Sequence, residues 1–187
     1  MSISQKPIKN YCQKDVCYKL ANMKYRIVCI LLCTSSCLFA QNTIVNKVNN
    51  YIKNKENITE NILFVSIIEQ KLYHITNNKI IKSYNISSSK YGTGNINGSN
   101  KTPMGLHKIA KKYGDQTPVN GKMIGRVYIE EIATIYLDNT QSKTDDVTSR
   151  ILWLEGLEKG KNKGKGIDSF KRYIYIHGTS EEGKIGI

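Results

Sequence analysis

One of the three histidines in the sequence has a setting suited to acid–base chemistry. His177 follows residues 173–176, in which tyrosine and isoleucine alternate, and it precedes Gly178. A stiff strand would present His177 at its end, and a glycine lets other backbone approach closely. An imidazole titrates near neutral pH, so it can accept a proton from a nucleophile. A non-catalytic residue at the end of a strand is the alternative that this local pattern leaves open.

The other two histidines have simpler interpretations. His74 and His107 each lie inside a strand-like segment, between residues that alternation turns to the opposite face. We expect both at the surface or at the rim of the domain.

The cysteines limit what other chemistry the chain can perform. They all lie in the first 40 residues, at Cys12, Cys17, Cys29, Cys33 and Cys37. A disulfide framework or a cysteine zinc site in the rest of the chain is therefore excluded. The last three follow helical spacing in an apolar run, where cysteine acts as a small hydrophobic residue. We expect neither a metal nor a cofactor.

The first 40 residues have the pattern of a leader. A basic stretch begins at Met23, an apolar run covers residues 27–39, and Ala40 offers a small residue for cleavage. We expect an extension over residues 1–22, a start at Met23 and a signal peptide over about 23–40. The run is too short for a membrane span, so we expect an exported protein of the periplasm or cell envelope. Lipid attachment at Cys37 stays open, although no aliphatic residue directly precedes it.

The net charge of +13 is not confined to this leader. The leader carries six basic side chains and one acidic one, which leaves +8 for the rest. Such a body suits an anionic partner, namely a wall polymer, a membrane or a nucleic acid. A general abundance of lysine in this chain explains the charge equally well.

The rest of the sequence predicts short strands separated by polar turns. Apolar residues at helical spacing indicate one amphipathic helix over 44–52. Strands are predicted, from apolar or β-branched runs, over 62–68, 71–75, 79–86, 106–110, 127–137, 150–154 and 173–176. The first three form a predicted β-meander, and the whole pattern favours a mainly β domain.

Two loops contain glycine at turn positions. Residues 87–101 are rich in serine, glycine and asparagine, and they lead into Thr102, Pro103, Met104 and Gly105. Residues 159–166 alternate lysine with glycine, but they lack the Gly-Lys-Ser/Thr of a phosphate-binding loop. We expect this second segment to be a solvated loop.

The order of these motifs resembles the L,D-transpeptidase (YkuD-type) catalytic domain from about Ile62 to the last residue. The resemblance lies in residues 91–94, in the Thr-Pro-Met-Gly turn with its flanks over 98–109, in residues 149–158, and in Ile-His-Gly-Thr at 176–179. It implies a β-sandwich with short helices, and peptidoglycan stem peptides as partners rather than nucleic acid.

The resemblance also implies a mechanism. In that family a cysteine thiolate attacks a stem-peptide amide, D-alanine leaves, and an amine from a neighbouring stem takes the acyl group. His177 would be the base and Gly178 would orient its ring through the backbone carbonyl. Thr102, Pro103 and Gly105 would border the substrate groove.

The sequence departs from that family at its end. It stops at Ile187, before the Ser-His-Gly-Cys stretch that holds the nucleophile. We therefore expect a helix and linker over 41–61, followed by a catalytic domain over 62–187 that is incomplete and inactive alone. Two alternatives stay open: a non-catalytic remnant that binds peptidoglycan, and a basic, tyrosine-rich domain that binds nucleic acid. The predicted export signal disfavours the second.

Overall fold

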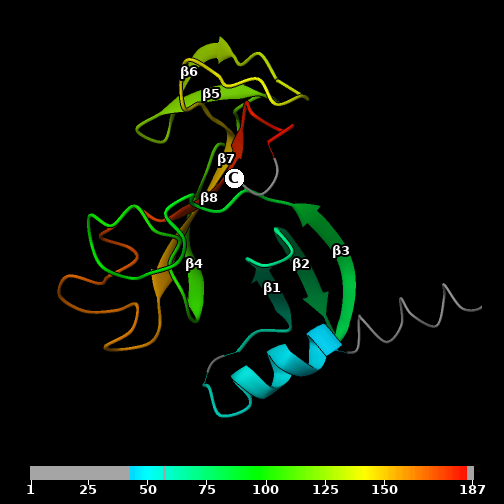
Figure 1. The fold of residues 1–187 in the computed structure, drawn as a ribbon, viewed down its shortest axis with the longest axis vertical. Coiled ribbons are helices and arrows are strands. Elements are labelled where there is room, and N and C mark those ends of the chain that lie inside the picture. Colours follow the sequence, from blue (N-terminus) through cyan, green and yellow to red (C-terminus); the bar gives the residue numbers. More distant parts are fainter. Residues whose placement is uncertain (1–42, 57, 185–187) are drawn as a thin grey trace, which may run out of the picture. The chain divides into compact units, whose positions relative to one another are not determined.

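The structure is a computed structural model that describes residues 43–56 and 58–184 (Figure 1). The predicted leader lies outside these residues. Within them the chain is mainly β, with one short helix over 43–52. The strands are β1 (Asn61–Ser66), β2 (Lys71–Thr76), β3 (Lys79–Asn85), β4 (His107–Tyr113), β5 (Gly121–Ile124), β6 (Val127–Ile132), β7 (Val147–Gly156) and β8 (Tyr175–Thr179).

The described chain divides into two compact units. One includes the helix and the residues up to Phe64, together with His74–Lys82. The other includes Val65–Tyr73 and everything described from Ser83 onward. All the residues that the sequence nominates for a site lie in the second unit.

The helix has the predicted amphipathic pattern. Its apolar face buries Val45 and Val48, which are one turn apart. On another face, the amide of Asn49 donates a hydrogen bond of 3.0 Å to the side-chain oxygen of Asn78. The helix is thus joined to the turn that follows β2, inside the first unit.

The predicted β-meander is present as a sheet with the strand order β1-β2-β3. The turn between β2 and β3 is formed by Asn77 and Asn78, whose φ angles are 50° and 59°. Positive φ at both central residues is the geometry of the tightest hairpins, and asparagine tolerates it better than most residues do. This explains why the Asn-Asn pair predicts the turn.

The second sheet is organised around β7. Its five strands follow the order β4-β7-β5-β6, and β8 also pairs with β7. All these pairings are antiparallel. With two antiparallel sheets and one short helix, the predicted mainly β class is confirmed.

All seven predicted strands differ in their bounds from the observed ones, and β5 was not predicted. β5 has only four residues and includes a glycine and a lysine, so its composition gives no strand signal. β6 stops at Ile132, whereas β7 is longer than predicted because it pairs with three neighbours.

The prediction for β8 was wrong at both ends. Tyr173 has a φ of 57° and lies in a turn, and β8 begins two residues later. Pairing with β7 then continues to Thr179. His177 therefore lies inside the strand rather than beyond its end.

The burial of β7 predicts where the second unit is most sensitive. Ile151 is 2% exposed, so Ile151→Ala should lower the free energy of unfolding by about 2–5 kcal/mol, through lost burial and a cavity. Ile124 is 69% exposed, and Ile124→Ala should change it by less than about 0.5 kcal/mol. Urea unfolding measures both, and equal losses would contradict this assignment of the core.

Candidate functional site

His177 is held on β8 with one ring nitrogen already engaged. It pairs with Ile151 of β7, and its side chain is exposed. Its Nδ1 lies 2.8 Å from the carbonyl oxygen of Gly178. A carbonyl oxygen only accepts hydrogen bonds, so Nδ1 carries the proton. In the neutral ring Nε2 is then unprotonated and able to accept a proton.

Gly178 lies where β8 closely approaches Thr148 of β7. It pairs with Thr148, beside an irregularity in β7 between Thr148 and Ile151. A Cβ atom at position 178 would lie 2.6 Å from Oγ1 of Thr148 and 3.0 Å from its carbonyl oxygen. Only glycine fits there without a shift of β7, and such a shift would move the neighbouring His177.

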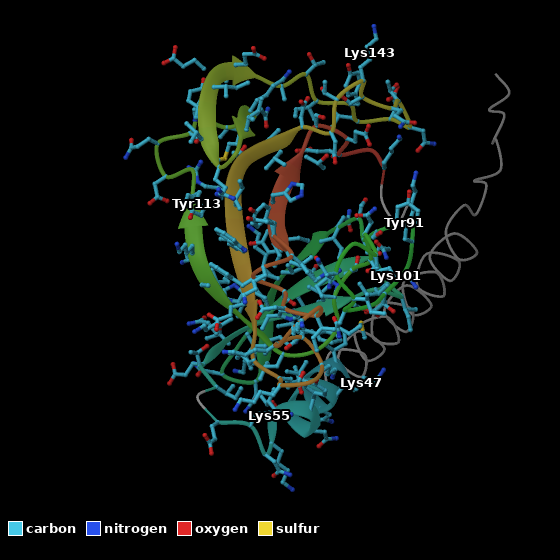
Figure 2. All side chains as sticks on the ribbon, turned by 90° about the vertical axis from the view of Figure 1, so that its left-hand side faces the viewer. Lys47, Lys55, Tyr91, Lys101, Tyr113 and Lys143 are labelled. Atoms are coloured by element: carbon cyan, nitrogen blue, oxygen red, sulfur yellow. The ribbon has the colours of Figure 1, made fainter. Side chains whose placement is uncertain are left out.

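Thr102 is fixed by three hydrogen bonds in the glycine-rich loop. Its N–H donates to the carbonyl of Gly92 at 3.0 Å, and its carbonyl accepts from Gly94 N–H at 2.9 Å. Its hydroxyl accepts from the N–H of Ser89 at 2.8 Å. The pairing also brings Tyr91 and Lys101 to one side of this loop (Figure 2).

An arginine joins this loop to the segment that leads into β8. Arg172 donates from Nη2 to the carbonyl of Lys101 at 2.9 Å and from Nη1 to that of Gly94 at 3.2 Å. No hydrogen bond among the described residues runs directly from His177 to the Thr102–Gly105 turn. The structure therefore brings together His177 with Gly178, and Thr102 with Pro103 and Gly105, as two groups.

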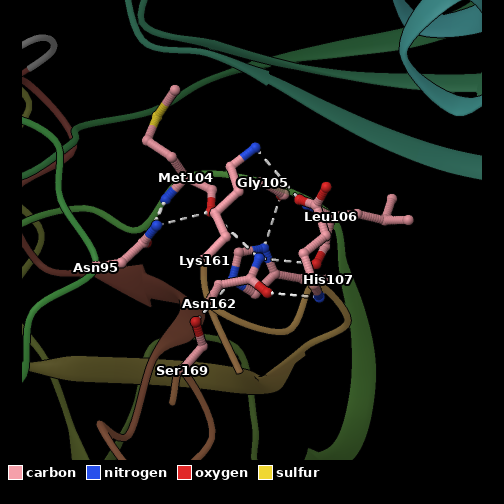
Figure 3. A network of polar contacts seen from close by, with 9 residues as sticks. Asn95, Met104, Gly105, Leu106, His107, Lys161, Asn162 and Ser169 are labelled. Atoms are coloured by element: carbon pink, nitrogen blue, oxygen red, sulfur yellow. Dashed lines mark hydrogen bonds and ion pairs between the residues drawn. The ribbon is translucent and has the colours of Figure 1, made fainter. Parts of the chain in front are cut away.

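Gly105 lies against a polar network that the sequence did not predict (Figure 3). The carbonyl of Gly105 accepts a hydrogen bond of 2.9 Å from Nδ1 of His107. On the other side of the ring, Nε2 lies 2.8 Å from the hydroxyl of Ser169, which is fully buried. His107 is half-buried in this network instead of lying at the surface or rim.

Asn162 is the centre of the same network. Its amide donates to the carbonyls of Met104 and Leu106 at 3.2 and 2.9 Å, and its oxygen accepts from Glu158 N–H at 2.9 Å. The Glu158 carboxylate in turn accepts from Leu106 N–H at 2.7 Å. Asn162 has an exposed fraction of 0%. The prediction of a solvated loop over 159–166 is therefore wrong at this position, because the loop turns one side chain inward to hold another loop.

Burial sets the protonation state of His107. Desolvation lowers the pKa of His107, although its bond to Gly105 and the negative charge of Glu158 act in the opposite direction. The neutral ring donates from Nδ1 to a carbonyl and accepts at Nε2 from the Ser169 hydroxyl. In this state His107 is a structural link rather than a free base.

The described residues offer a proton acceptor in His177, but they contain no cysteine. They also contain no group of histidine, cysteine and acidic side chains that could hold a metal. Within the same ranges, no helix is long and apolar enough to cross a membrane. The described residues therefore supply the base of a nucleophile–base pair, His177, but no thiol nucleophile.

Comparison with known proteins gives one match. The family model described as the L,D-transpeptidase catalytic domain, YkuD, matches residues 60–186. No curated protein and no solved structure matches the chain.

Gly105 provides a test of the network. Its φ is +106°, and a Cβ there would collide with the Glu158 carboxylate and lie 2.8 Å from the Asn162 amide. Gly105→Ala should therefore destabilise the chain by about 1–3 kcal/mol more than backbone strain alone does. Gly160→Ala is the matched control, since Gly160 has a φ of +74° and nothing within 4 Å. Equal losses in urea unfolding would show that this contact has no energetic role.

His107 predicts a pH dependence of stability. Its folded pKa is lowered below 6.5, so the unfolded chain takes up a proton that the folded chain resists. The free energy of unfolding should therefore fall as the pH drops below about 6.5. His107→Gln should show a smaller fall than the unsubstituted chain, measured by urea unfolding between pH 5 and 8. Parallel curves for the two proteins would contradict the prediction.

Proposed function

Because the chain belongs to the L,D-transpeptidase catalytic domain family, we propose that it serves cysteine-dependent acyl transfer between peptidoglycan stem peptides. The observation that most supports this is the hydrogen bond of 2.8 Å between His177 Nδ1 and the Gly178 carbonyl. It leaves Nε2 of an exposed ring as the acceptor for a thiol proton.

In the proposed reaction the thiol proton moves to Nε2 of His177, and the thiolate attacks the amide carbonyl of a stem peptide. The C–N bond breaks, the departing D-alanine amine takes the proton, and a thioester remains. An amine from a second stem attacks the thioester and restores the thiol. His177 serves as base and then as acid, so its ring must keep one orientation.

The other predicted site residues have supporting roles in this proposal. Gly178 would fix the ring of His177 through its carbonyl. Thr102, Pro103 and Gly105 would border the groove that receives the stem peptide. The support is their rigidity, because Thr102 is held by the glycine-rich loop and Gly105 by the network around Asn162. A fixed groove wall positions a substrate at a lower entropic cost than a mobile one.

The nucleophile is the missing part of the proposed pair. Residues 38–187 contain no cysteine. We therefore infer that the 187-residue polypeptide by itself binds wall peptides without turning them over. A non-catalytic module that holds peptidoglycan is the second candidate, favoured by this absence and by the charge of +8 outside the leader.

The proposed setting is the cell envelope, where members of this family act on the wall. It is supported by the signal-peptide pattern over about 23–40. The proposed organisation is a leader over 1–40, a helix and linker over 41–61, and the catalytic domain over 62–187.

Two measurements on purified residues 41–187 test this function. The polypeptide should co-sediment with isolated peptidoglycan and should be released by salt, because exposed charges are screened. It should release no D-alanine from a wall tetrapeptide and form no mass adduct with it. Failure to co-sediment would contradict peptidoglycan recognition. Release of D-alanine would contradict the need for a cysteine from outside residues 38–187.

A further inference from the structure

Arg126 is surrounded by aromatic rings in the second unit. It lies between β5 and β6 with a φ of 73°. Its Cζ is 4.9 Å from the ring centre of Trp153 and 5.9 Å from those of Tyr113 and Tyr173. Its Nη1 donates a hydrogen bond of 2.9 Å to the hydroxyl of Tyr175. Tyr113, at the end of β4, is labelled in Figure 2.

These rings form a rigid platform. Trp153 stacks on Phe170 with ring centres 4.1 Å apart and planes inclined by 4°. The ring planes of Tyr175 and Trp153 are inclined by 89°, in an edge-on arrangement. The indole N–H of Trp153 donates a hydrogen bond of 3.0 Å to the carbonyl of Phe170. Cation–π contacts with a fixed ring and a hydrogen bond to a phenol leave the guanidinium little freedom.

The charge of Arg126 has no acidic partner among the described residues. None of their ion pairs involves Arg126, whereas Lys108 and Lys163 both pair with Glu155. Its contacts are a neutral phenol and π faces, so most of its N–H donors remain available. The hydrogen bond to Tyr175 raises the pKa of Arg126, which keeps the guanidinium charged.

Arg126 also lines an open cavity. This cavity has a volume of about 330 Å³ and is lined by Arg126 together with Thr117 and Tyr128. Asp115 lines it too, without an ion pair to Arg126. Tyr175 and His177 are two residues apart on β8, so their side chains project from the same face of the sheet. The hydrogen bond to Tyr175 thus joins Arg126 to the face of the sheet from which His177, the proposed base, projects.

We propose that Arg126 binds the carboxylate of the ligand at the proposed active site, whose base is His177. A planar guanidinium held over aromatic rings can bind a carboxylate in the two-bond geometry that arginine favours. The proposal rests on the proposed function for its ligand, a wall stem peptide with a free carboxylate. It adds a specificity: an acid peptide should bind better than the same peptide with an amide end.

Trp153 can serve as a fluorescent probe of this site, because it is the only tryptophan in the sequence and lies against Arg126. The purified 187-residue chain is titrated with a wall tetrapeptide, as the C-terminal acid and as the amide, and the emission of Trp153 is followed. The acid should bind at least tenfold more tightly than the amide. Arg126→Gln should remove this preference, while Arg126→Lys should keep part of it because it retains the charge without the planar fork.

Lys111→Gln is the matched control. The Lys111 ammonium lies 5.7 Å from the ring centre of the same Trp153, so the substitution removes an equal charge from the same ring. It should keep the preference for the acid within twofold. Circular dichroism checks that every variant is folded.

Three outcomes would overturn the inference: equal binding of acid and amide, a preference that survives in Arg126→Gln, or no binding of either peptide. Co-sedimentation with peptidoglycan separates the two proposals. If that binding persists while the acid preference is absent, only the role of Arg126 fails. If it is also lost in the unsubstituted chain, the proposed function fails as well.

Discussion

The backbone pairing of β7 is the constraint on which the rest of the second unit depends. One strand pairs with β4, β5 and β8, so its position sets theirs (Figure 1). It buries Ile151 and Trp153 while it holds β8 in the register that places His177 opposite Ile151. A one-residue slip of β8 would turn His177 to the other face of the sheet. The close contact between Gly178 and Thr148 acts against such a slip, because most residues have a Cβ that this contact excludes.

Polar side chains hold the loops in place as strand pairing holds the sheet; Asn162 is buried, and Glu158 and Arg172 are half-buried. Asn162 and Glu158 bind the backbone of residues 104–106, and Arg172 binds the carbonyls of Gly94 and Lys101. The carbonyls of Met104 and Leu106 each accept a second hydrogen bond as well, from the Asn95 amide and from Leu157 N–H. Removing the Asn162 side chain would take a hydrogen-bond partner from three backbone groups at once. A buried polar group left without a partner costs more than the net gain of an average hydrogen bond. The loops are therefore rigid although they contain little regular structure.

The sequence predicted those features that local patterns determine. Helical spacing marked Val45 and Val48, the Asn77–Asn78 pair marked a hairpin, and the order of motifs indicated the family that the match over residues 60–186 shows. It did not predict β5, whose four residues carry no strand signal and whose existence depends on its partners. The contact between His107 and Ser169 spans 62 residues, and no local pattern carries such a pairing. For the same reason the sequence did not predict the role of Asn162, which appears there as one polar residue in a lysine–glycine loop. Nor did it predict the setting of Arg126, because the aromatic rings around it come from three separate segments of the chain.

The claim that connects the structure to the chemistry is that β8 presents His177 with Nε2 free to take a proton. The most direct test is the tautomer of the neutral ring, measured by nitrogen–proton correlation NMR on ¹⁵N-labelled chain. The account predicts the proton on Nδ1, where the Gly178 carbonyl accepts it at 2.8 Å, and an unprotonated Nε2. A neutral ring with its proton on Nε2 would contradict the account, because Nε2 could not then take the thiol proton.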